Sequence, residues 1–398
     1  MRRMLSAIYK RNTEIAANQM LAEKALSVNV SHDDPSVSSK ERPKEYAFNY
    51  QPPKRHKMLS SLHDFDIIFG PATACECLST SGFEYAYMND YKDAAERKTK
   101  IFVGGSFGAY RLTALAGSII MKTDLVKLFY EHIIDMTYKK DSTPEALGVM
   151  LKDLRSKVAG NAVQHAILEN EEFELVVWVA RLKPVYRWLH KYVNFCVLGS
   201  FGLMNIISRR ILKAAVFDRL CFYSGKTAPD LFPAKYVSEF HKITTENFEA
   251  VLQATSCIPG ITEPVNEIPG CGAGMFLDAA VCDYNIGFRV NDRFKGLVVN
   301  QYEKLNRTYF DKAIKFRSVP EDFFDNTALI YPTDHFVNRI QLKRLPSLNE
   351  WFEDCFVEDP KKRMEYWGKV HELSKLYLCE DIKMQMNAVP ARNKQVEE

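Results

Sequence analysis

The feature that most constrains the fold is the segment at residues 101–111, which reads IFVGGSFGAYR. Three apolar residues suited to a buried strand lead into Gly104, and apolar positions at helical spacing follow from Ala109 onwards. Strand, G-x-S-x-G and helix in this order form a nucleophile elbow, whose tight turn projects the serine beyond the strand. Gly104 and Gly108 lack a Cβ, so the helix can pack close to the strand. The segment predicts an α/β fold and makes Ser106 a candidate nucleophile for acyl groups.

Two other interpretations of the same segment stand beside the elbow. An ordinary strand–turn–helix crossover in an α/β domain would show the same pattern, because glycine and serine are common turn residues. A dinucleotide-binding loop fits less well, since the order G-G-S-F-G does not give G-x-G-x-x-G. The elbow therefore needs support from the rest of the chain.

Composition excludes several classes of protein. The 398 residues can bury a large core, and a net charge of +3 is too small to indicate nucleic-acid binding. The nine cysteines are scattered, without a C-x-x-C pair or Cys/His ligand spacing, so we expect no metal or other cofactor. An odd cysteine count without a secretory signal favours a reduced, cytoplasmic protein. No apolar run reaches the roughly 18 residues of a membrane-spanning helix.

The chain divides into three parts by composition. Residues 1–60 hold eleven Lys and Arg against six Asp and Glu, with four prolines between 31 and 57, which predicts a flexible basic arm. Residues 384–398 are polar and predict a flexible C-terminal tail. The folded domain is expected over residues 61–383. Its strands are predicted at 65–69, 101–103, 174–180 and 219–223, and its helices at 74–97, 109–121, 122–170 and 244–254. This alternation predicts a three-layer α/β fold with a mostly parallel sheet flanked by helices.

A candidate base for Ser106 comes from two later segments, ATSCIPGITEPV at 254–265 and FLDAAVCDYN at 276–285. They resemble the C-terminal half of a patatin-like phospholipase domain, where A-S-x-x-I-P precedes an apolar residue and D-G-G/A. In that family the aspartate pairs directly with the elbow serine, as a dyad without histidine. The resemblance implies a patatin-like fold over residues 61–383, with Asp278 as the partner of Ser106.

Further motifs make the resemblance strongest to a poorly characterised bacterial branch of that superfamily. Its elbow, S-x-G-A-W-R, is similar to residues 106–111, and its D-Y-H is similar to Asp283-Tyr284-Asn285. Residues 309–317 resemble its W-F-D-K…W-R, and a segment like residues 205–210 also occurs there. The resemblance runs from about residue 63 to about residue 355. It implies a lipid acyl ester as substrate, hydrolysed or trans-acylated through an acyl-enzyme, with no cofactor.

Two departures from the family pattern bear on activity. Ala279 stands where the family has glycine, and its methyl group could crowd the serine or shift the aspartate. The glycine-rich oxyanion loop is replaced by Gly70-Pro71-Ala72-Thr73, in which Pro71 has no N–H to donate. The N–H groups of Ala72, Thr73 and Phe107 are the remaining candidates. Losing one donor costs about 3–4 kcal/mol of barrier. The alternative function is therefore a catalytically weak or inactive relative that binds lipid or a protein partner.

Two other features leave alternatives open. His165, His241 and His335 could complete a three-residue site, but none belongs to a motif that connects it to Ser106. Residues 184–206 are aromatic and apolar, with Arg187 and Lys191 one turn apart. This stretch is either a peripheral membrane contact, with the protein then membrane-associated, or a buried helix pair that covers the sheet.

Overall fold

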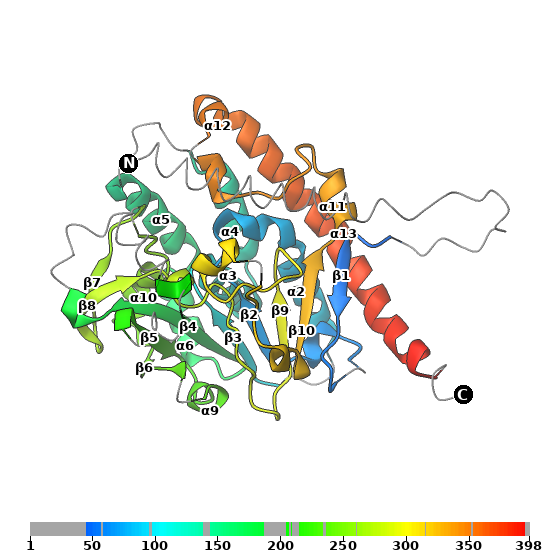
Figure 1. Cartoon of the computed structure of the whole chain (residues 1–398), viewed down its shortest axis with the longest axis horizontal. Coiled ribbons are helices and arrows are strands. Elements are labelled where there is room, and N and C mark those ends of the chain that lie inside the picture. The colour runs from blue at the N-terminus through cyan, green and yellow to red at the C-terminus, as the bar shows by residue number, and fades with distance from the viewer. Residues whose placement is uncertain are drawn as a thin grey trace.

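A ten-stranded mixed sheet forms the centre of the computed structural model (Figure 1). The structure describes residues 45–56, 59–94, 98–137, 144–186, 204–206, 208, 215–233, 236–259, 261–314, 316–351 and 353–394. The strands are β1 (Phe48–Gln51), β2 (Ile67–Gly70), β3 (Lys100–Gly104), β4 (Phe173–Leu182), β5 (Phe217–Tyr223), β6 (Glu239–Lys242), β7 (Val265–Ile268), β8 (Gly272–Leu277), β9 (Gly296–Val299) and β10 (Thr327–Pro332).

Helices connect most of these strands. The α-helices are α2 (Gly82–Asp93), α3 (Phe107–Met121), α4 (Leu125–Asp135), α5 (Pro144–Val158), α6 (Asn161–Glu169), α9 (Ala228–Leu231), α10 (Phe248–Thr255), α11 (Asp334–Arg339), α12 (Asp354–Glu358) and α13 (Pro360–Lys394). Short 3-10 helices are η1 (Leu62–Asp64), η2 (Ala74–Thr80), η6 (Ala279–Val281), η7 (Tyr309–Ala313), η8 (Glu321–Asp325) and η9 (Leu348–Trp351). The region predicted as helical over 122–170 contains α4, α5 and α6.

The five central strands of the sheet are parallel, antiparallel pairs flank them, and β6 pairs parallel with β5 at the margin. Strands β10, β9, β2, β3 and β4 lie side by side in this order and run parallel. Strand β1 pairs antiparallel with β10, and β4 pairs antiparallel with both β5 and β8. The predicted α/β class, with a mostly parallel sheet and flanking helices, is confirmed. That the arrangement is patatin-like stays a prediction.

Alternation of side chains along the central strands supplies both faces of the core. Ile68 and Phe102 face the long helices α2, α3 and α13, in one continuous apolar cluster. Ile67 and Val103 face the opposite side, where α9, η8 and the loop at 284–294 cover the sheet within the described ranges. Both faces of β2 and β3 are buried, which is why these strands read as unbroken apolar runs.

Strand β1 lies within the expected N-terminal arm, so the predicted domain boundary at residue 61 is wrong. Its edge is covered by α13 (Figure 1), because the N–H groups of Ala47 and Phe48 donate to Asp381 Oδ2 at 2.7 and 3.0 Å. The side-chain amide of Gln385 donates to Phe48 O at 2.7 Å. These contacts occupy backbone groups that an edge strand would otherwise expose. The first 44 residues of the expected arm lie outside the described residues.

The expected flexible tail at 384–398 is also corrected. Helix α13 continues to Lys394, and Met386 is buried within the stretch expected to be a tail. The composition of this stretch is polar because α13 turns one face to β1 and the other to solvent. Residues 395–398 lie outside the described part of the chain.

Candidate active site

The predicted elbow is present at the carboxyl end of β3. Strand β3 ends at Gly104 and α3 begins at Phe107, so only Gly105 and Ser106 make the turn. Ser106 has a φ of 51°, a left-handed conformation that is sparsely populated by residues with a side chain. Such backbone strain costs about 1–3 kcal/mol and gathers at functional sites. It directs the Ser106 side chain away from the strand, as an elbow requires.

Close backbone contacts explain the glycines of the elbow. A Cβ at Gly104 would lie 2.7 Å from the backbone nitrogen of Ala109 at the start of α3. A Cβ at Gly108 would collide with the backbone of Gly70 and would lie 2.5 Å from the carbonyl oxygen of Pro71. Both positions therefore require glycine for steric reasons. The same contacts hold the loop after β2 against the elbow.

Ser106 and Asp278 meet as the resemblance implies. Ser106 Oγ donates a hydrogen bond to Asp278 Oδ2 at 2.6 Å, and each residue is 2% exposed. Asp278 follows β8, which is anchored to the sheet by its pairing with β4. Its backbone N–H donates to Cys257 O at 2.9 Å. The ATSCIPG segment thus lies against the aspartate, which explains why the two motifs occur together in this chain.

Burial gives Asp278 the proton affinity of a base at neutral pH. Removal from water raises the pKa of its carboxyl from 3.8 to about 7, because the charged form loses solvation. The hydrogen bonds from Ser106 Oγ and from Ala280 N, at 2.7 Å to Oδ1, lower the pKa in part. A carboxylate with a pKa near 7 can accept a proton from a hydroxyl far better than an exposed aspartate.

Thr255 is a site residue that the sequence interpretation missed. The backbone N–H of Ser106 donates to Thr255 Oγ1 at 2.9 Å, and the Thr255 hydroxyl donates to the carbonyl oxygen of Trp178 on β4. Thr255 therefore connects the strained elbow to the neighbouring strand. The one sequence signal for this role is that Thr255 lies inside the ATSCIPG segment, between Ala254 and Ser256.

The predicted oxyanion donors differ in whether their N–H groups are already hydrogen-bonded. The N–H of Ala72 donates to Tyr284 O at 3.0 Å, so this predicted donor is already occupied. Among the described residues, the backbone N–H groups of Thr73 and Phe107 have no hydrogen-bond partner. Both residues are buried, and the loop of Thr73 touches the elbow. Phe107 N–H also lies at the first turn of α3, where the helix dipole favours negative charge.

Ala279 does not displace Asp278 from the serine. The methyl group of Ala279 faces Gly105, because a Cβ added to Gly105 would lie 2.7 Å from the Cβ of Ala279. The second glycine of the elbow thus provides the space that the methyl group fills. Because residue 105 is glycine, the Ala279 methyl group does not crowd the serine. The hydrogen bond of 2.6 Å between Ser106 and Asp278 is kept.

Two other motif segments form a buried polar cluster. Asn205 Nδ2 donates to Asp311 Oδ1 at 2.9 Å, and Arg317 lies 3.5 Å from the same carboxylate. Arg317 also donates to the carbonyl oxygens of Asn205 and Ile206. Asn205 and Asp311 are fully buried. These motif residues hold two distant segments together and do not contact Ser106.

Asp283 and Tyr284 likewise have a structural role, beside the loop at residues 70–73. The Tyr284 hydroxyl donates to Glu76, which also accepts from Lys312 Nζ at 3.1 Å. Asp283 pairs with the buried Arg219, with 2.9 Å between Nη2 and Oδ1. These contacts fix Tyr284, whose carbonyl oxygen accepts the hydrogen bond from Ala72 N–H.

The three candidate histidines do not form a three-residue site with Ser106. Within the described part of the chain, no histidine hydrogen-bonds to Ser106, whose side chain pairs with Asp278 alone. Each candidate histidine lies near a glutamate instead: His165 near Glu169, His241 near Glu239 and His335 near Glu45. His241 also lies near Cys271, and with Glu239 these residues form a group that could hold a metal ion.

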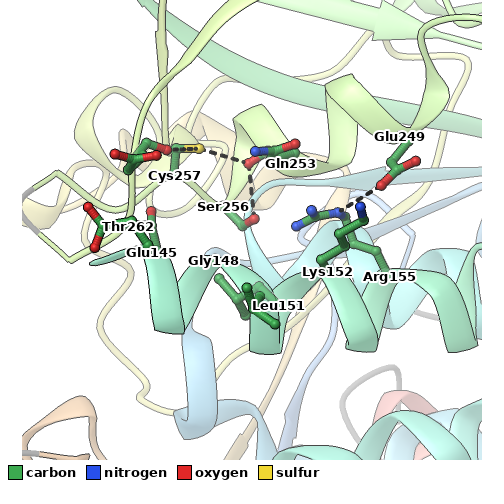
Figure 2. Close-up of a pocket in the computed structure, with 12 residues that line it drawn as sticks. Glu145, Gly148, Leu151, Lys152, Arg155, Glu249, Gln253, Ser256, Cys257 and Thr262 are labelled. Atoms are coloured by element: carbon green, nitrogen blue, oxygen red, sulfur yellow. Dashed lines mark hydrogen bonds and ion pairs between the residues drawn. The ribbon is translucent and has the colours of Figure 1, made fainter. Parts of the chain in front are cut away.

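A pocket of about 320 Å³ borders the base side of the site, between α5 and α10 (Figure 2). Its wall includes Ser256 and Cys257, which directly follow Thr255. On the opposite wall, Arg155 of α5 points toward Glu249 of α10, at 4.0 Å. Neither Ser106 nor Asp278 lines this pocket, so it adjoins the dyad without opening onto it.

The aromatic stretch proposed as a membrane contact lies mostly outside the described residues. No helix in the described ranges has both the length and the apolarity needed to cross a membrane.

Comparisons with family models, curated proteins and solved structures give no match. The function must therefore be argued from the chemistry of the site.

Proposed function

We propose that this protein is a serine-dependent acyl ester hydrolase that uses a Ser106–Asp278 dyad. The observation that carries the proposal is the hydrogen bond of 2.6 Å between Ser106 Oγ and Asp278, made by a serine in a strained elbow. A hydroxyl is a weak nucleophile until a base takes its proton. Asp278 supplies that base, and the strand–turn–helix layout supplies the approach to an acyl carbon.

The reaction proceeds in two balanced steps. Asp278 accepts the Ser106 hydroxyl proton while Oγ bonds to the ester carbonyl carbon, and the tetrahedral intermediate then expels the alcohol, which takes the proton from Asp278. Water next attacks the acyl-enzyme, gives its proton to Asp278 and releases the acid as Ser106 recovers a proton. The N–H groups of Phe107 and Thr73 stabilise the oxyanion in both steps.

Lipid acyl esters are the proposed substrate class, and this choice rests on the resemblance to patatin-like phospholipases. The motifs that carry the resemblance support it by their arrangement: the elbow and the Asp278 segment meet at the dyad. Transfer of the acyl group to an alcohol in place of water uses the same intermediate. A cytoplasmic location with peripheral membrane association belongs to the same proposal.

One observation favours the alternative, a weak or inactive relative that binds lipid or a protein partner. Ala72 N–H is bonded to Tyr284 O, so among the described residues Thr73 is the one remaining loop candidate beside Phe107. Each lost donor reduces turnover by about 100- to 1000-fold. The two functions differ in whether Ser106 reacts at all.

The test is covalent labelling of full-length protein with a fluorophosphonate, which traps an activated serine. We expect labelling of the unchanged protein, none of Ser106→Ala and slowed labelling of Asp278→Asn. Ser156→Ala, which removes an exposed serine hydroxyl on α5, serves as the matched control and should label normally.

Substrate class is then tested with glycerophospholipids and with short and long acyl p-nitrophenyl esters. Activity toward acylated lipids that disappears with Ser106→Ala supports the proposal. A folded protein that neither reacts with the probe nor hydrolyses any ester contradicts it. In that case binding to phospholipid vesicles would identify the lipid-binding alternative.

A further inference from the structure

A group of possible metal ligands lies at the end of the sheet opposite β1, away from the dyad. Glu239 and His241 are two residues apart on the outer strand β6, so both side chains lie on the same face. Cys271 lies in the turn between β7 and β8. Although Cys271 is 30 residues from His241, the fold brings the ligand atoms of all three residues within 4.8 Å of one another.

The distances from His241 Nε2 to the other two ligand atoms are close to those of a tetrahedral zinc site. Cys271 Sγ lies 3.5 Å from His241 Nε2, and that nitrogen lies 2.9 Å from Glu239 Oε2. With Zn–S of about 2.3 Å and Zn–N and Zn–O of about 2.0 Å, tetrahedral angles place sulfur about 3.5 Å and oxygen about 3.3 Å from the nitrogen. The sulfur already stands at this separation, and the carboxylate needs a shift of about 0.4 Å.

Each ligand is held by its surroundings. The ring of Phe222 on β5 stacks on the ring of His241, with centroids 5.2 Å apart. The turn that carries Cys271 is fixed by Gly270 and Gly272, whose φ angles are 78° and 88°. The Cys271 N–H donates to Ile268 O at 3.0 Å across this turn. Ligands held this way lose little freedom when a metal binds.

Arg181 on β4 is the charged neighbour of this group. It donates to both oxygens of Glu239, and its Nη2 also lies 3.2 Å from Asp218 Oδ2. Ligating carboxylates in metal sites are themselves hydrogen-bonded, and Arg181 gives Glu239 such a partner. Asp218 pairs with Arg181 and also with Lys183, whose Nζ lies 2.7 Å from Asp218 Oδ1. Arg181 Nη1 also lies 4.0 Å from Cys271 Sγ. A Cys271 thiolate and Glu239 supply two negative charges for a divalent cation, beside the positive charge of Arg181.

We propose that Glu239, His241 and Cys271 bind a zinc ion, with a fourth position open to water. A thiolate with an imidazole selects zinc over the hard cations magnesium and calcium. The ion joins the outer strand β6 to the tip of the β7–β8 hairpin, where Asn247 Nδ2 already donates to Lys242 O and to Pro269 O. The site is independent of the Ser106–Asp278 chemistry.

The experiment uses full-length protein, freed of metal with a chelator and kept reduced. Titration with Co²⁺ reports the ligands by absorption, and competition with a chromophoric chelator gives the zinc affinity. We expect one equivalent of Co²⁺ with a thiolate-to-metal charge-transfer band, displaced by zinc. Cys271→Ser should abolish the band, and His241→Ala should weaken zinc binding at least about tenfold.

Matched controls separate this site from other cysteines and histidines. Cys379→Ser and His335→Ala change a half-buried thiol on α13 and an imidazole on α11, and both should bind as the unchanged protein does. Zinc should also raise the unfolding temperature of the unchanged protein but not that of Cys271→Ser. Zinc binding that survives in both Cys271→Ser and His241→Ala overturns the proposal, as does absence of binding by the reduced, folded protein.

Discussion

Replacing Asp278 by asparagine is expected to stabilise this protein at alkaline pH while removing its activity. Asparagine keeps the size of the side chain, and its Oδ1 can still accept the Ala280 N–H. It cannot carry the negative charge that burial makes unfavourable. The substitution therefore isolates the free energy of holding an ionised carboxylate at this site.

The magnitude follows from the pKa of Asp278, which burial raises from 3.8 to about 7. The native state then binds a proton more tightly than the unfolded chain, so stability from this group falls as the pH rises from about 4 to about 7. The full difference of about 3 pKa units corresponds to about 4 kcal/mol of destabilisation above neutral pH. Between about pH 5 and about pH 8 this destabilisation grows by about 2–3 kcal/mol.

The assay is urea unfolding of both proteins at these two pH values. The gain in unfolding free energy from Asp278→Asn should be about 2–3 kcal/mol larger at the higher pH. Glu350, whose pKa burial also raises to about 7, is present in both proteins and cancels in the comparison. Ester hydrolysis by the unchanged protein should rise through about pH 7 as Asp278 ionises.

A different result would refute this account of the base. If Asp278→Asn changes the unfolding free energy by the same amount at both pH values, then Asp278 does not titrate between them and the raised pKa is wrong. If hydrolysis persists undiminished in the variant, Asp278 is not the base. The two outcomes are separate, because the first measures folding and the second measures turnover.

Three further predictions follow from the packing around the dyad and the sheet edge. Gly105→Ala should destabilise by about 1–3 kcal/mol by overpacking against Ala279, and the added change Ala279→Gly should restore most of the loss, as a double-mutant cycle in urea would measure. Thr255→Val should leave a buried N–H unpaired, costing about 1–3 kcal/mol and lowering kcat, whereas Thr255→Ser should preserve both unfolding free energy and rate. Asp381→Leu should free two N–H groups of the β1 segment, and hydrogen exchange there should accelerate while exchange in β3 does not.

The local pattern was sufficient for the centre of the fold. Apolar runs of β-branched and aromatic residues predicted β2, β3, β4 and β5, because strands buried on both faces need apolar side chains at every position. The glycines at 104 and 108 predicted the elbow, because the close approach of α3 to β3 excludes a Cβ. The resemblance supplied Asp278 as the partner of Ser106, although the two residues are 172 positions apart.

The margins of the fold could not be predicted in this way. Strand β1 lies in a polar, proline-containing stretch, and α13 passes into residues that resemble a tail. Asp381 and Gln385 join the two segments, and β1 also pairs with the distant strand β10, so neither segment shows its structure alone. Residues that are ordered only by distant hydrogen bonds carry little local signal.

The α/β class and the elbow around Ser106 could be predicted from the sequence, because strand periodicity and close backbone packing restrict which residues stand next to one another. The arrangement of groups around the dyad could be known only from the folded chain. Folding put Thr255 on the Ser106 N–H, occupied the Ala72 N–H with Tyr284 O and gave the Ala279 methyl group its space at Gly105. It also buried Asp278, which raises its pKa to about 7. These properties depend on contacts between distant segments and on exclusion of water, which no local pattern records.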